Sequence, residues 1–135
     1  MRWCSDSQVL IPLLQELPDL HLTLFGRHAA DLSYTNVTNI SGDAGILPEL
    51  IKVMKNQEVI LINSDNKKVT ELLIDAMHKT GVKRIIQAGV LSVYGEVAEP
   101  FAVWNNLMMG ESVAHNRGVE ALEVSYMDYT YMRMT

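Results

Sequence analysis

The sequence predicts an α/β fold, a doubly wound parallel sheet with helices on both faces, and three observations favour this class. Short apolar runs alternate with apolar stripes at helical spacing along the chain. The runs lack strict polar alternation, which is typical of parallel strands that are covered on both faces. The composition, 48% hydrophobic and 20% charged residues, is that of an ordinary globular protein. No repeat or linker divides the 135 residues, so we expect a single domain over 1–135.

The first half of the chain predicts two helices and three strands. Apolar residues from Val9 to Leu17 follow the capping candidates Ser5, Asp6 and Ser7, which indicates a helix. Pro12 fits this helix only near its first turn, because proline lacks the N–H of a helix interior. A second apolar stripe predicts a helix over 46–54, and the expected strands are 21–25, 37–40 and 58–63.

The second half contains the clearest helix, 67–80, with Gly81 well placed to end it. The buried strand expected over 82–90 runs into the polar turn Ser-Val-Tyr-Gly. Helical patterns near 101–109 and 111–124 and a strand start at 129–132 follow. Strands that alternate with helices imply a parallel sheet with right-handed crossovers.

Charge and cysteine content argue against several classes of protein. The net charge of −5, with no long cluster of Lys and Arg, gives no reason to expect a nucleic-acid partner. No apolar run approaches the roughly 20 residues that span a bilayer, so we expect no membrane association. The single cysteine, Cys4, fits a reducing compartment and hence a cytoplasmic protein. The four histidines lack metal-ligand spacing, so no metal site is expected.

Ligands of an open α/β sheet bind across the carboxyl ends of its strands. Arg27 follows the 21–25 strand, and its guanidinium could pair with a phosphate or be an ordinary surface group. Asp43 follows the 37–40 strand, where it could accept a hydrogen bond from an adenine amino group or cap the next helix.

Asn63 and Ser64 end the 58–63 strand, so they could line the same crevice. Alternatively, Ser64, Asp65 or Asn66 caps the 67–80 helix, and both roles can coexist. Tyr94 follows the 82–90 strand, and its phenol could bind a ligand or its ring could pack against the loop.

An ordered set of segments resembles one known superfamily: HLTLFGR, SGD, EVILIN, GVKRII, VYGE, WNN and MDYT. From about Gln8 to Arg133 the chain resembles the atypical short-chain dehydrogenase/reductases, in their NmrA-like, NAD(P)H-binding branch. The resemblance implies a Rossmann fold that binds NADP or NAD. It implies that Arg27 lies near the adenosine ribose, where arginine favours the 2′-phosphate of NADP. It implies that Asp43 lies near the adenine, with Asn63 and Ser64 beside the ribose and pyrophosphate.

The chain departs from the family at its first strand and glycine-rich turn, whose backbone N–H groups hold the pyrophosphate. The corresponding segment MRWCSDSQ has no glycine, and Asp6 would repel a phosphate. We therefore expect a first strand that is missing or degenerate. The apolar edge left by its loss favours self-association, so the protein could be a homo-oligomer.

The catalytic residues of the family are a tyrosine, a lysine after it and a serine at a strand end. Here Gly89 and Val90 take the serine positions, so Gly89 would lie at the cofactor. The tyrosine and lysine segment aligns with AHNRG, where His115 or Arg117 could fill those places. His115 could act as an acid/base near neutral pH or be a surface histidine, and Tyr94 is the remaining candidate.

These residues lead to a main hypothesis and two alternatives. The main hypothesis is an NAD(P)H-binding oxidoreductase-like protein that transfers a hydride to a small carbonyl or quinone-like substrate. The alternatives are a non-catalytic dinucleotide-binding module that senses redox state, and a shortened remnant without activity. The fold alone does not choose among these, because one scaffold hosts many functions.

Overall fold

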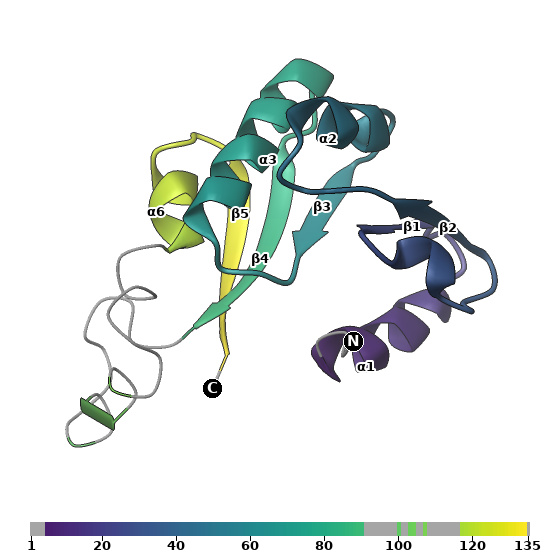
Figure 1. Cartoon of the computed structure of the whole chain (residues 1–135), viewed down its shortest axis with the longest axis horizontal. Helices are drawn as coiled ribbons and strands as arrows, with labels where there is room; N and C mark the ends of the chain where they lie inside the picture. Colours follow the sequence, from purple (N-terminus) through teal and green to yellow (C-terminus); the bar gives the residue numbers. More distant parts are fainter. Residues whose placement is uncertain (1–4, 91–99, 101–102, 105–106, 108–116, 135) are drawn as a thin grey trace.

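The computed structural model describes residues 5–90, 100, 103–104, 107 and 117–134. Helices and strands alternate over these residues, which confirms the expected α/β class (Figure 1). In chain order the elements are α1 (Ser5–Gln15), β1 (Leu22–Gly26), the 3-10 helix η1 (Ala29–Asp31), β2 (Val37–Ser41), α2 (Leu47–Met54), β3 (Val59–Ile62), α3 (Lys67–Thr80), β4 (Arg84–Val90), α6 (Gly118–Glu123) and β5 (Asp128–Met134).

All described strands pair in parallel, and they form two sheets. β1 pairs with β2 in one sheet, and the other has the order β3-β4-β5. The doubly wound Rossmann sheet has the strand order 3-2-1-4-5-6. The two sheets correspond to 3-2 and 4-5-6, so no described strand occupies position 1 between β1 and β3. This is where the sequence predicts a missing or degenerate first strand.

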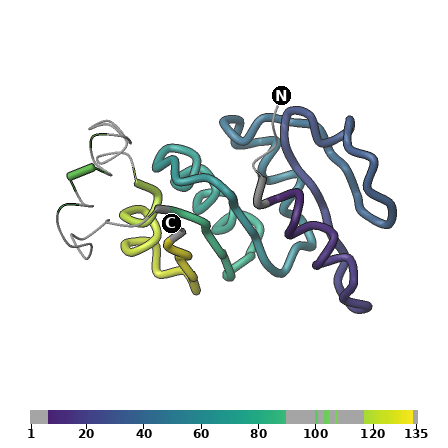
Figure 2. Tube along the Cα trace, turned by 90° about the horizontal axis from the view of Figure 1, so that it is seen from below, coloured from purple at the N-terminus to yellow at the C-terminus, as the bar shows by residue number. Residues whose placement is uncertain are grey.

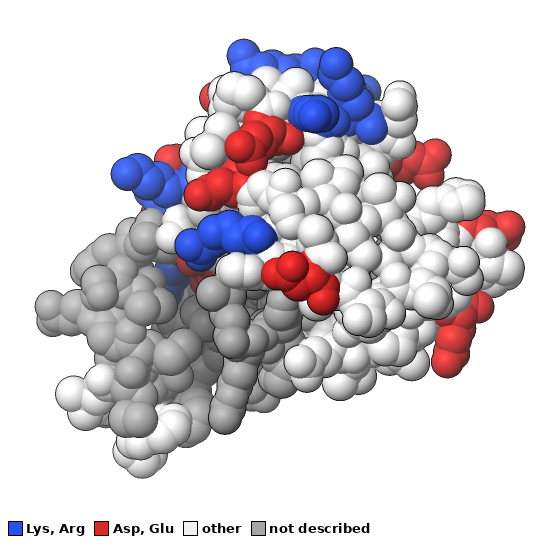
Figure 3. All heavy atoms as spheres, turned by 45° about the vertical axis from the view of Figure 1, so that its right-hand side comes forward, with Lys and Arg blue, Asp and Glu red and all other residues white. Residues whose placement is uncertain are grey.

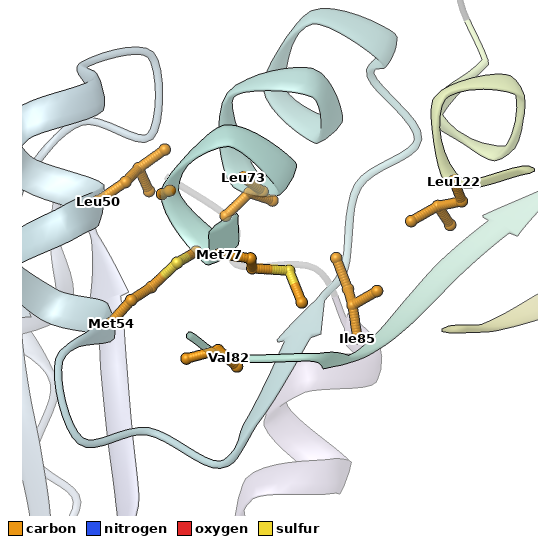
Figure 4. Packing of buried hydrophobic residues seen from close by; sticks show 8 residues of the cluster. Leu50, Met54, Leu73, Met77, Val82, Ile85 and Leu122 are labelled. Atoms are coloured by element: carbon orange, nitrogen blue, oxygen red, sulfur yellow. The ribbon is translucent and has the colours of Figure 1, made fainter. Parts of the chain in front are cut away.

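The hydrophobic core lies on one face of the three-stranded sheet, beneath α2, α3 and α6 (Figures 1 and 4). Helix α3 occupies the centre, with α2 packed on one side of it and α6 on the other. The buried side chains of this cluster are Leu50, Met54, Leu73, Ala76, Met77, Val82, Ile85 and Leu122.

The other side of β3 is much less covered. Val59 and Leu61 are 49% and 44% exposed, whereas Ile60 and Ile62, which alternate with them, pack against the core. Val9 and Leu13 of α1 are also 65% and 56% exposed. In the tube of Figure 2, α1 lies with β1 and β2 toward one end of the molecule, and α6 and β5 lie toward the other. The face of β3 opposite the core is therefore apolar and exposed, and no described strand pairs with the edge of β3 away from β4.

Two local signals are confirmed and one expectation is wrong. Asn66 caps α3, because its Oδ1 accepts a hydrogen bond from the Val69 N–H at 3.2 Å. Gly81 ends the same helix in the left-handed region, with φ of 82°. Pro12, expected near a first turn, lies inside α1 because the helix begins earlier, at Ser5. The carbonyl of Gln8 there lacks its usual intrahelical donor.

Charge is spread unevenly over the surface. On the face shown in Figure 3, Lys and Arg side chains gather mainly along the upper edge, and a broad area right of centre carries no charge. Among the described helices, none has the length and apolar character that crossing a membrane requires.

Candidate functional site

The polar residues predicted to bind a cofactor follow the carboxyl ends of the strands. Arg27 comes directly after β1, and Asp43 comes two residues after β2. Because β1 and β2 are parallel and in register up to Gly26 and Ser41, both residues lie at the same edge of that sheet. Asn63 and Ser64 follow β3 at the corresponding edge of the other sheet, and Gly89 lies near the end of β4. The topology therefore brings the candidates together within each sheet.

Asp43 closes a tight turn ahead of α2. Its Oδ1 accepts a hydrogen bond from the Gly45 N–H at 2.7 Å, and its own N–H donates to Glu49 Oε2 at 2.7 Å. The N-cap of α2 is Ile46, which makes no side-chain cap bond. The interpretation of Asp43 as a helix cap is therefore wrong, because the carboxylate forms an Asx turn instead. Arg27 is exposed, so its role toward a phosphate stays a prediction.

The turn that connects β3 to α3, residues 63–66, is held from two sides. On one side, Asn63 Nδ2 donates to Ser7 Oγ of α1 at 3.2 Å. On the other side, Gln87 Nε2 of β4 donates to the Ser64 carbonyl at 2.8 Å. A turn fixed in this way keeps one geometry toward a ligand at the strand ends. The contact of Asn63 and Ser64 with a cofactor is not tested by these bonds and stays a prediction.

Gln87 belongs to a buried polar pair that the sequence analysis missed. Gln87 and Thr70 are both 0% exposed, and Thr70 Oγ1 donates to Gln87 Oε1 at 3.2 Å. A Cβ at Gly118 would overlap Gln87 Nε2 and Thr70 Oγ1, so glycine lets α6 begin against this pair. The signal was one amide in the apolar run RIIQAGV, since a buried amide needs partners from other elements.

Asp65 and Tyr131 form a second connection at this edge. Tyr131 Oη donates to Asp65 Oδ2 at 2.7 Å, and the Gly118 N–H donates to Asp65 Oδ1 at 2.8 Å. A Cβ at Gly89 would overlap the Tyr131 hydroxyl. The absence of a side chain at Gly89 thus has a packing reason, and its predicted role at the cofactor stays untested. The sequence analysis named Asp65 only as a possible cap and did not single out Tyr131.

Of the three candidate catalytic residues, the structure describes Arg117. Tyr94 and His115 lie outside the described residues. Arg117 is the N-cap residue of α6, immediately before Gly118, and is partly buried. Their acid/base roles therefore stay predictions.

One ionisable side chain beside these residues has a shifted pKa. Lys67 Nζ donates to Glu120 Oε2 at 2.9 Å, and this hydrogen bond, together with the carboxylate charge, raises the pKa of Lys67. The pair joins the start of α3 to α6 at the surface.

A small cavity lies beside α1, and one of its lining residues, Ser7, also bonds to Asn63 of the 63–66 turn. The cavity has a volume of about 40 Å³ and is lined by Ser7, Gln8, Ile11, Leu32 and Tyr34. This is room for a water or two, not a dinucleotide.

Comparison with known proteins decides the family. The model of an NAD(P)H-binding family matches residues 7–135, which is nearly the whole chain. The chain belongs to this NAD(P)H-binding family. The match confirms the expected NAD(P)H-binding family and the expected cofactor class, NADP or NAD.

Solved structures share the Rossmann fold of this family member. A short-chain dehydrogenase/reductase from Veillonella parvula, solved in complex with NADP, has a TM-score of 0.90 at 21% identity over 97% of this chain and 64% of that one. An oxidoreductase from Lactococcus lactis has a TM-score of 0.74 at 16% identity over 96% and 64%. An NADPH-dependent quinone oxidoreductase from Escherichia coli has a TM-score of 0.66 at 19% identity over 93% and 42%.

These similarities support the fold and leave the activity open. The chain spans about two thirds of the length of the Veillonella parvula protein and less than half of that of the quinone oxidoreductase. No curated protein sequence matches the chain.

Proposed function

We propose that this chain binds NADP(H), or NAD(H), across the carboxyl ends of its strands and transfers a hydride to a small carbonyl or quinone-like acceptor. One observation carries the proposal: in a member of an NAD(P)H-binding family, Arg27, Asp43 and the 63–66 turn each follow a parallel strand. Ligands of open α/β sheets bind at these strand ends. The NADP complex of one structural neighbour and the NADPH-dependent quinone reduction of another support the choice of cofactor and acceptor.

Each residue has a proposed contact with the cofactor. The exposed guanidinium of Arg27 pairs with the 2′-phosphate of NADP, because its planar fork matches two phosphate oxygens. The carboxylate of Asp43, held by Gly45, accepts from the adenine amino group. Asn63 and Ser64 bind the ribose and pyrophosphate from a turn that Ser7 and Gln87 hold in place. Gly89 lies beside the cofactor at the end of β4.

The chemistry proposed for the chain is positioning and proton transfer. When bound, the reduced nicotinamide supplies the hydride. Reduction of a carbonyl also needs a proton, which His115 or Tyr94 would donate to the substrate oxygen. Arg117 would stabilise the negative charge that develops on that oxygen.

A second candidate function is a dinucleotide-binding module that senses redox state without catalysis. The observation that favours it is at Gly89, where the hydroxyl over β4 comes from Tyr131 and already donates to Asp65. A remnant without activity is the remaining alternative, and it is favoured by the position between β1 and β3 that no described strand occupies. Measurements of cofactor binding and then of turnover distinguish the oxidoreductase, the sensor and the inactive remnant.

The proposal is tested by calorimetric titration of the folded chain with NADPH and then NADH at one salt concentration. We expect saturable binding that favours NADPH, followed by oxidation of NADPH in the presence of small quinones or aldehydes. Binding without turnover would select the sensor. No binding up to millimolar NADPH, by a chain with intact circular dichroism, would contradict both functions.

We also propose that the chain forms a homo-oligomer through the open edge of β3, in the cytoplasm. Unpaired strand edges with exposed apolar side chains, here Val59 and Leu61, promote association. The single cysteine supports a reducing compartment. Light scattering after size-exclusion chromatography is expected to show a species larger than 15.2 kDa, and a monodisperse monomer would contradict the proposal.

A further inference from the structure

Two side chains to which the proposed function assigns no role, Asp65 and Tyr131, tie the 63–66 turn to distant parts of the chain. The carboxylate of Asp65 accepts from the Tyr131 hydroxyl with one oxygen and from the Gly118 N–H with the other, at 2.7 Å and 2.8 Å. Tyr131 belongs to β5 and Gly118 begins α6, so three elements meet at one carboxylate. Hydrogen bonds to an ionised acceptor are roughly twice as strong as neutral ones. We name these three residues and their two bonds the latch.

The Tyr131 hydroxyl occupies the space that a side chain at position 89 of β4 would fill. In the parallel register Tyr131 lies beside Gln87, and its ring extends along the sheet until its hydroxyl lies over Gly89. A Cβ at position 89 would overlap this hydroxyl, so Gly89 and Tyr131 fit only as a pair. The hydroxyl at the end of β4 therefore comes from the neighbouring strand.

The latch acts on the turn together with two other anchors. Gln87 holds the carbonyl of Ser64, and Ser7 holds the side chain of Asn63. Asp65 follows these residues directly, so loss of its bonds frees the turn on the side of α6 and β5. The turn and the start of α6 are then no longer held to one another through the carboxylate.

We propose that Asp65 and Tyr131 are positioning residues, which hold Asn63 and Ser64 in the geometry that receives the dinucleotide. Tyr131 supplies from β5 the hydroxyl that Gly89 cannot supply from β4. In this proposal both residues act on the cofactor site through the turn. This inference rests on the proposed function, because it concerns the turn assigned to the cofactor's ribose and pyrophosphate.

The first test removes only the hydroxyl, in the full-length variant Tyr131→Phe. We expect amide hydrogen exchange to rise at least severalfold both in residues 63–66 and at the start of α6, in the absence of any cofactor. We expect NADPH to bind about tenfold more weakly, the size of effect that a hydrogen bond to a charged group gives. Tyr129→Phe is the matched control, since it removes the hydroxyl of an exposed tyrosine from the same strand.

A second test moves the hydroxyl from Tyr131 to position 89. It asks whether a hydroxyl at this place is enough, or whether the tyrosine ring is needed. Tyr131→Val clears the space over Gly89, and Gly89→Ser is then added so that β4 supplies a hydroxyl beside Asp65. We expect Gly89→Ser to recover a large part of the lost NADPH affinity. Gly89→Ala in the same Tyr131→Val background adds the same Cβ without a hydroxyl and is expected to recover none.

The outcomes separate the latch from the proposed function. If the unchanged chain does not bind NADPH, the proposed function fails and the positioning role fails with it. If the unchanged chain binds and Tyr131→Phe binds equally well, the positioning role alone is overturned. Equal recovery by serine and alanine at position 89 would also overturn it, because packing would then explain the effect. Asp65→Asn, which keeps the size of the side chain, replaces Tyr131→Phe in these assays if that variant does not fold.

Discussion

The two sheets of this protein are stabilised in different ways. The sheet of β3, β4 and β5 lies beneath three helices, and the hydrophobic core cluster of the described residues is there (Figure 4). It also holds the buried pair of Gln87 and Thr70. In the sheet of β1 and β2, every residue of β1 is only partly buried, and α1 leaves apolar side chains exposed.

This difference matters because the proposed cofactor contacts both sheets. Arg27 and Asp43 belong to the less buried sheet, and the 63–66 turn belongs to the well-packed one. The hydrogen bonds that connect the parts include those from Gln57 to Thr23 at 3.2 Å and from Asn63 to Ser7 at 3.2 Å. A dinucleotide bound at both sets of strand ends would add a further connection between the sheets.

The largest expected effect comes from the core of the three-stranded sheet. Leu122→Ala removes a fully buried side chain, and we expect the free energy of unfolding to fall by about 2–5 kcal/mol. Leu13→Ala on α1 is the matched control, and its 56% exposed side chain predicts a loss below about 1 kcal/mol. Urea unfolding measures both. Equal losses of unfolding free energy in the two variants would contradict the proposed difference between the core of the three-stranded sheet and α1.

A smaller effect is expected from one methyl group at the buried polar pair. Gly118→Ala places a Cβ against Gln87 and Thr70, so we expect about 1–3 kcal/mol of destabilisation from overpacking. The control is Gly45→Ala near α2, where the Cβ meets only the end of the Asp43 side chain at 3.1 Å. Thermal unfolding compares the two variants. A larger loss of stability in Gly45→Ala would show that the part of the molecule with β1 and β2 is the more tightly constrained one.

On the side of β1 and β2, Arg27→Ala tests the contact with the 2′-phosphate. We expect NADPH affinity to fall about tenfold or more and NADH affinity to change little, because only NADPH carries the charge that arginine binds. Lys83→Ala, an exposed cation near the amino end of β4, is the control. Calorimetric titration with NADPH and with NADH measures the affinities of both variants. Equal losses for NADPH and NADH would remove Arg27 from this role.

The smallest effect is the pH dependence of the surface pair between α3 and α6. The pKa of Lys67 is raised above its ordinary 10.5 by Glu120, so the pair stabilises the fold below that pH. The contribution is lost as the pH rises through the higher pKa of the folded state. Unfolding measured from pH 9 to pH 12 is expected to show a slightly steeper loss in the unchanged chain than in Glu120→Gln. Identical profiles would show that the pair does not stabilise the fold.

The sequence predicted best those features that depend on neighbouring residues. The bounds of α3 were predicted because Asn66, the apolar stripe and Gly81 all lie within one segment. The position of Pro12 and the interpretation of Asp43 as a helix cap were wrong. Each depends on where a helix begins, and that is set by packing as well as by local preference.

The buried polar contacts could not be predicted, because they join residues far apart in sequence. Asp65 and Tyr131 are 66 positions apart, and their bond depends on the register of β4 with β5. Gly89 illustrates the difference most clearly. The sequence showed a strand end without a reactive group, and the structure shows that a tyrosine from the next strand fills the space.

Hydrogen exchange with and without NADPH tests the central claim most directly, because it locates the site as well as detecting binding. The account predicts that NADPH slows exchange together in residues 26–28, 42–45 and 63–66, which belong to both sheets. Unchanged exchange at saturating NADPH, or protection confined to the outer surfaces of α2 and α3, would contradict a cofactor site at the strand ends.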